Sequence, residues 1–133
     1  MTHKMNNVKI LEKLSEIAEQ YGLYKKEAYL FILVALEYTV ANLTERRHLS
    51  GQELSKGIAN FAREQYGYMA ATVIENWGIH STADFGTIVY HMIENKLLAK
   101  TETDSIEDFD NVFEFESEFI WENVRPREYP ERF

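Results

Sequence analysis

The sequence predicts a mainly α-helical domain with a small β-hairpin, in which N-terminal helices precede a winged-helix-like unit. Three observations carry this prediction. Apolar residues recur at helical spacing over most of the chain, a helix-turn-helix pattern occupies residues 69–95, and period-two alternation follows it. The 133 residues suffice for one domain with a sizeable core, so we assign residues 1–133 to a single domain.

Three parts are predicted within this domain. A helical part covers about residues 5–66, and a winged-helix-like part covers about residues 68–116. Residues 117–133 form an aromatic tail that contains two prolines. Because alternation resumes at Phe119 and Trp121, the sequence leaves open whether this tail is a strand, a helix or an extended segment.

The first two helices are predicted from their apolar patterns. Residues 8–21 carry apolar side chains at steps of three and four, which predicts an amphipathic helix with this stripe in the core. Gly22 ends it. The next helix covers about residues 26–43, and its stretch 28–36 is apolar on all sides, which is typical of a central, mostly buried helix.

A third helix is predicted from a capping signal. Ser50 stands three residues before Glu53, the spacing of a capping box, and the helical pattern then continues to Tyr66 before Gly67. A glycine inside a helix costs about 1 kcal/mol relative to alanine. We therefore expect Gly57 to mark the close approach of a neighbouring helix.

The helix-turn-helix pattern comes next. Residues 69–77 predict a short helix that Gly78 closes, and Ser81 or Thr82 caps a second helix that ends near Asn95. Residues 97–101 and 112–116 then predict the two strands of the wing, since Phe113 and Phe115 alternate with glutamates. The acidic loop between these strands completes the predicted hairpin.

The charge distribution argues against DNA recognition by this architecture. Residues 1–100 hold eleven acidic and eleven basic residues, whereas residues 101–133 hold eleven acidic residues and three arginines, so the net charge of −8 lies entirely in the last quarter. DNA affinity comes largely from Lys and Arg on phosphates. The second helix of the helix-turn-helix has no arginine, and the predicted wing is acidic. Direct DNA binding by a helix-turn-helix transcriptional regulator is therefore kept only as an alternative.

One compact basic group is present. Arg46, Arg47 and His48 follow the second helix, where they could contact a phosphate or carboxylate ligand or simply match the helix dipole. A small enzyme or anion binder using this turn is the second alternative. The acidic loop at residues 102–110 lacks EF-hand spacing, which leaves cation binding there open. No catalytic motif is found, and we expect neither a metal nor a cofactor.

The cellular setting follows from absences in the sequence. There is no cysteine, which excludes disulfides and thiolate metal sites. The N-terminus has no apolar signal region, and the most apolar run is nine residues, well short of the roughly 20 that span a bilayer. We therefore expect a cytoplasmic protein without a membrane partner.

The sequence resembles a family of small bacterial proteins. The similarity lies in the stretch RHLSGQEL at residues 47–54, in Trp77-Gly78, in Asp84-Phe85-Gly86 and in residues 97–115. It extends over about residues 24–119. The family is uncharacterised and known by a locus-tag name, so the resemblance implies a stand-alone cytoplasmic protein and brings no activity, cofactor or catalytic residue.

Together these features favour a non-catalytic module that binds protein. Winged folds with acidic wings have helix and wing faces free for protein contacts. The expected interaction surface contains Tyr90 and His91 on the second helix of the pair, with Phe119 and Trp121 in the tail. Aromatic residues are favoured at such interfaces, and a homodimer through this surface is a further expectation.

Overall fold

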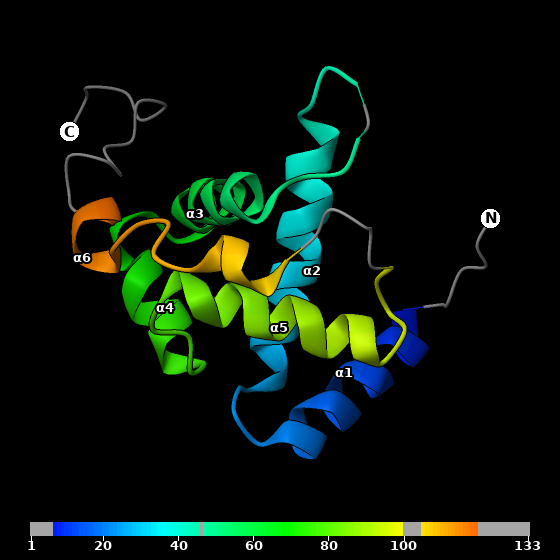
Figure 1. Ribbon diagram of the computed structural model, residues 1–133. Helices are drawn as coiled ribbons and strands as arrows, with labels where there is room; N and C mark the ends of the chain where they lie inside the picture. The colour runs from blue at the N-terminus through cyan, green and yellow to red at the C-terminus, as the bar shows by residue number, and fades with distance from the viewer. Residues whose placement is uncertain (1–6, 46, 100–104, 120–133) are drawn as a thin grey trace.

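The structure is a computed structural model that describes residues 7–45, 47–99 and 105–119. The chain is mainly helical (Figure 1). The α-helices are α1 (Asn7–Tyr21), α2 (Lys26–Ala41), α3 (Gly51–Tyr66), α4 (Ala70–Asn76), α5 (Thr82–Glu94) and α6 (Phe115–Glu118), with 3-10 turns η1 (Gly67–Met69) and η2 (Ile106–Phe109). The five longer helices confirm the sequence prediction, with ends that differ by no more than two residues.

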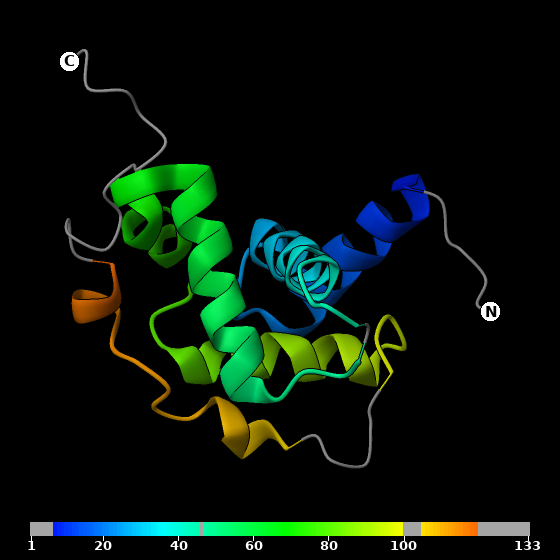
Figure 2. The ribbon, with the colours of Figure 1, turned by 90° about the horizontal axis from the view of Figure 1, so that it is seen from above.

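Helix α2 lies at the centre of the molecule. It packs against α1, α3 and α5, which surround it in the two views of Figures 1 and 2. Its side chains Tyr29, Ile32 and Ala35 are fully buried and meet Phe85 and Ile88 of α5 in one continuous core. The apolar character of α2 therefore supplies the centre of the fold, as the sequence predicted.

The close approach predicted at Gly57 is confirmed. A Cβ atom at this position would lie 2.6 Å from the Cγ2 atom of Thr39 on α2, which is shorter than any normal carbon contact. The absence of a side chain thus lets α3 rest directly on α2. The packing of these two helices compensates for the helical propensity lost at glycine.

The predicted β-hairpin is wrong, because no residue in the described ranges forms a strand. Helix α5 ends in a Schellman motif: the Leu97 N–H donates to the Met92 carbonyl at 2.9 Å, and the Lys96 N–H donates to the Ile93 carbonyl at 3.0 Å. Lys96 has a φ of 68°, so the chain turns back where the first strand was expected. The helix-turn-helix order of α4 and α5 is present without a wing in the described residues.

Residues 105–119, called the C-terminal segment below, run along α5 and α3 instead of forming the hairpin (Figure 2). Its phenylalanines pack in several directions: Phe109 against Gly86, and Phe115 against Phe85 with ring centroids 5.9 Å apart. Phe115 also begins the short helix α6. The alternation of Phe113 and Phe115 therefore reflects packing of an irregular segment against α5, and not a two-sided strand.

Candidate functional site

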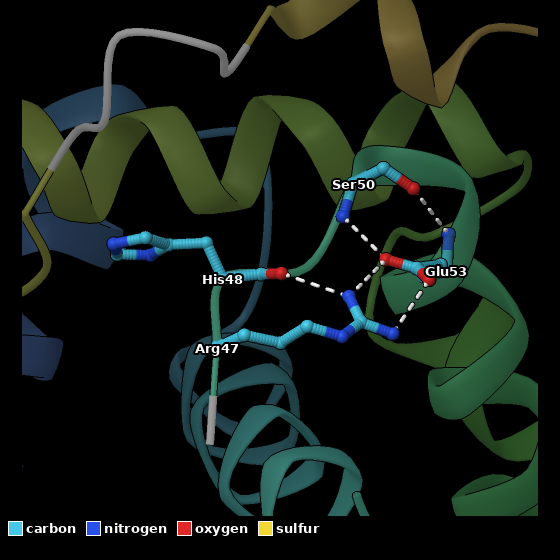
Figure 3. Close-up of polar contacts among 4 residues, drawn as sticks. All are labelled: Arg47, His48, Ser50 and Glu53. Atoms are coloured by element: carbon cyan, nitrogen blue, oxygen red, sulfur yellow. Dashed lines mark hydrogen bonds and ion pairs between the residues drawn. The ribbon is translucent and has the colours of Figure 1, made fainter. Parts of the chain in front are cut away.

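The basic turn before α3 forms a closed network of hydrogen bonds (Figure 3). Both terminal nitrogens of Arg47 donate to the carboxylate of Glu53 at 3.0 Å, and the Arg47 guanidinium also donates to the His48 carbonyl. Glu53 accepts the Ser50 N–H at 2.9 Å, while the Ser50 hydroxyl accepts the Glu53 N–H, which confirms the predicted capping box. Arg47 extends this box by one residue.

Within this network the positive charge of Arg47 is balanced by the Glu53 carboxylate. The Arg47 guanidinium, followed by the Ser50 N–H, lowers the pKa of Glu53 to about 2, so the carboxylate stays ionised and matches the arginine. Arg46 lies outside the described residues, and the His48 side chain is exposed beside a small, mostly apolar pocket of about 100 Å³. The turn is thus bound to its own helix terminus, which weakens the case for an anion site there.

The outward face predicted for α5 differs in the structure. His91 is only 8% exposed, Thr82 is fully buried and Tyr90 is half-buried. The expectation that the His91 side chain faces solvent is wrong, because α1 and the C-terminal segment cover two sides of α5, whereas Tyr90 keeps part of its surface exposed. His91 and Thr82 therefore belong to the interior of the fold.

His91 sits in a tyrosine cluster between α1, α2 and α5. Its Nδ1 lies 2.7 Å from the Tyr29 hydroxyl, and the Tyr21 ring stacks on the imidazole with centroids 3.5 Å apart. Burial raises the pKa of Tyr29 to about 12 and lowers the pKa of His91. Both side chains are therefore neutral, and the histidine tautomer sets the direction of the hydrogen bond between them. The cluster binds three helices together.

Phe119, the described member of the predicted aromatic surface in the tail, is also buried. Phe119 is 7% exposed and packs edge-to-face on Phe115 at a centroid distance of 5.4 Å. Arg63 of α3 lies over the Phe119 ring and forms an ion pair with Glu118 at 3.0 Å. Phe119 thus anchors the C-terminal segment. Trp121 lies outside the described residues.

The acidic residues of the C-terminal segment do not converge. Among the residues that the structure describes, no group of three or more histidines or carboxylates has the arrangement of a metal site. Part of the predicted loop, residues 102–104, falls outside them.

An open apolar groove lies between α1 and α2. It has a volume of about 740 Å³. Six apolar side chains contribute to its lining, together with Asn7, Glu37 and Lys96: Ile10, Leu11, Leu30, Leu33, Val34 and Leu97. The Schellman turn at the end of α5 places Leu97 and Lys96 at one edge. The groove is therefore built from two helices and the turn after α5, and it has a charged residue of each sign.

Several apolar side chains at this groove are exposed to a degree that is unusual for their type. Among the lining residues, the exposed fractions are 49% for Leu11 on α1, and 37% for Leu30 and 42% for Val34 on α2. Val8, three residues before Leu11 on α1, is 63% exposed. Because α2 is apolar on all sides, one face fills the core while the other remains open. The prediction that the whole apolar stripe of α1 lies in the core is confirmed for Leu14 and Ile17 and wrong for its first turns.

Sequence reasoning missed this groove although its signal was present. An apolar stretch without a polar face, as in residues 28–36, can be covered on all sides only if enough chain is available. Here three helices cover part of α2, and its outer strip is left over. Counting the elements available to cover α2 would have identified the strip.

No protein-family model matches the chain, and neither curated proteins nor solved structures give a significant match to it. The resemblance to a small bacterial family stays a prediction. A separate finding concerns the membrane: within the described ranges, every helix is too short or too polar to cross a bilayer.

Proposed function

We propose that the protein is a non-catalytic interaction module, on a scaffold with a helix-turn-helix order, that docks a partner helix in the groove between α1 and α2. The observation that carries the proposal is the exposed apolar strip along this groove, formed by Leu11, Leu30 and Val34. Contiguous exposed apolar surface of this kind marks interaction sites on soluble domains.

The chemistry of the groove defines the occupant. An amphipathic helix lays its apolar face into a hydrophobic groove through residues spaced by three or four positions. The groove walls are themselves helices, and the lining contains only one acidic and one basic residue, Glu37 and Lys96. A partner helix of low net charge therefore fits better than a nucleic acid or a strongly charged peptide.

The DNA-binding alternative is weakened by the position of the C-terminal segment. This segment contains six acidic residues and no lysine or arginine, and it packs directly on α5, the helix that would enter the major groove. Acidic side chains beside a recognition helix repel phosphates. The anion-binding alternative is weakened in turn by the ion pair of Arg47 with Glu53.

Site-directed photocrosslinking in cells tests the proposal. We expect p-benzoylphenylalanine in place of Val34 to give a discrete adduct with a protein identifiable by mass spectrometry, through an apolar helix face of that protein. Ile106 is the matched control because it is 39% exposed, close to the 42% of Val34, but lies on η2. Equal adducts at both positions, or none at position 34, would contradict the proposal.

A further inference from the structure

We infer that the occupant of the α1/α2 groove is a second copy of this chain. In the proposed dimer, a twofold axis sets α1 of each copy against α2 of the other. The inference rests on the proposed function, since it names the partner for the same groove. Most homo-oligomers are twofold dimers in which one patch pairs with itself.

The groove has the two halves that such a contact requires. Leu11 lines the groove from α1, while Leu30 and Val34 form the open strip of α2, and all three are exposed. In an isologous interface, the α1 residues of one copy meet the α2 residues of the other, and the reverse contact forms at the same time. The chain therefore supplies both the apolar helix and the surface that receives it.

Charges at the groove are complementary under the same symmetry. Glu37 on α2 and Lys96 after α5 both line the groove and are both exposed. Neither side chain forms an ion pair with another described residue. When the groove meets its own copy, Glu37 of each protomer can face Lys96 of the other. Two ion pairs of opposite direction then close the interface, as electrostatic complementarity requires.

The charge distribution favours self-association through the α1/α2 groove over self-association through the C-terminal segment. Helices α1 and α2 carry three lysines and five glutamates, so both signs are present there, whereas all charged residues of the C-terminal segment are acidic. Figures 1 and 2 place α6 and α1 at opposite ends of the molecule. A contact through α1 and α2 keeps the two acidic segments apart, and their repulsion is weak beyond the Debye length of about 8 Å.

Sedimentation equilibrium of the full chain tests the dimer. We expect a concentration-dependent monomer–dimer equilibrium, and we expect the combined Leu11→Gln and Val34→Gln substitutions to raise its dissociation constant at least about tenfold. Leu23→Gln is the matched control, because Leu23 is 61% exposed but does not line the groove. A chain that stays monomeric up to about 1 mM overturns the inference. Circular dichroism verifies that each variant is folded.

A charge exchange tests the orientation. Glu37→Lys and Lys96→Glu should each weaken dimerisation, because like charges then face each other in both halves of the interface. Mixing the two variants should restore a heterodimer, and the double variant should restore a homodimer. Failure of both combinations to recover affinity while each single variant is weakened would overturn the twofold arrangement.

The crosslinking experiment separates this inference from the proposed function. An adduct of the purified chain with itself at position 34, formed between two molecules, supports both. An adduct in cells with a different protein, from a chain that does not dimerise, overturns the dimer and leaves the docking function intact. An adduct with residues 1–6 of the same molecule, or no adduct in any setting, overturns both.

Discussion

The outer faces of α5 and α2 are both apolar, yet the chain covers one and leaves the other open. Along α5, the C-terminal segment seats Phe109 against Gly86, and the carbonyl of Phe109 accepts a hydrogen bond from Thr82 at 2.6 Å. Along α2, Leu30 and Val34 remain exposed. The difference shows that an apolar helix face indicates a contact but not its source, which is internal at α5 and, by our proposal, external at α2.

The largest effect on stability is expected at Phe109, which anchors the C-terminal segment on the covered face of α5. Phe109 is 5% exposed and lies against Gly86 of α5, and its turn η2 also packs on α3. Phe109→Ala removes a buried ring and should lower the free energy of unfolding by about 3–5 kcal/mol, as such truncations do. Urea denaturation measures the loss. A decrease below about 1 kcal/mol would mean that the C-terminal segment does not stabilise α5.

Thr82→Val comes next because it removes two hydrogen bonds and almost no volume. The Thr82 hydroxyl donates to the Phe109 carbonyl and accepts the Val112 N–H at 3.1 Å. Valine leaves both backbone groups without this partner, which should lower the free energy of unfolding by about 2–3 kcal/mol. Thr87→Val is the control, because the Thr87 hydroxyl donates to the Ala83 carbonyl of its own helix and also neighbours the Tyr24 hydroxyl, but forms no hydrogen bond with a described residue of the C-terminal segment. Equal losses for the two variants would contradict the assignment.

Gly86→Ala should have an intermediate effect. A Cβ atom there would lie 2.7–2.9 Å from three carbons of Phe109, so the C-terminal segment must shift. Overpacking of this kind costs about 1–3 kcal/mol, partly offset by the higher helical propensity of alanine. A double-mutant cycle with Phe109→Ala isolates the clash. The loss should shrink in the Phe109→Ala background, because alanine removes the Cγ and Cδ2 atoms and keeps only the Cβ atom at 2.9 Å. Additivity of the two changes would show that the Phe109 ring does not limit this position.

A smaller effect is expected from pH at the cluster that ties α1 to α5. Burial lowers the pKa of His91 from its ordinary value of 6.5, so the unfolded chain takes up the proton first. Stability should therefore fall as the pH decreases below 6.5, and the loss should end once the pH passes the lowered pKa of the folded state. Unfolding of the wild type and of His91→Gln, compared between pH 7.5 and 5.5, measures it. An identical pH dependence in both would contradict the prediction.

The smallest effect is expected on the open face. Val34→Gln changes a side chain that is 42% exposed and should alter the stability of the dilute monomer by no more than about 0.5 kcal/mol. The same substitution should weaken association, as described above. A large loss of monomer stability would show instead that the strip is covered by the chain itself, and would remove the contrast between α2 and α5.

Local signals decided most of what could be predicted. Helical periodicity, the capping box at Ser50 and Glu53, and Gly78 predicted five helices correctly. Gly57 correctly predicted the close approach of a neighbouring helix, which the structure shows to be α2. These features act within a few residues along the chain, so the sequence exposes them directly. The candidate site was not predicted, because an interaction surface depends on which side chains the other elements leave uncovered.

The C-terminal segment shows where local reasoning fails. Alternation of Phe113 and Phe115 is compatible with a strand, but a strand needs a partner, and the Schellman turn at Lys96 directs the chain away from one. Contacts with Gly86, Phe85 and Arg63 then fix the phenylalanines of this segment individually. No spacing rule encodes such distant partners.

The sequence by itself thus determined the helices, their caps and the acidic character of the last quarter. Only the tertiary structure decided that His91 and Phe119 face inward and that Leu11 and Val34 face outward. The physical reason is that periodicity reports which residues avoid water, whereas exposure depends on how much chain is available to cover each face. On α2 that coverage is incomplete, and the exposed strip is the basis for the proposed interaction.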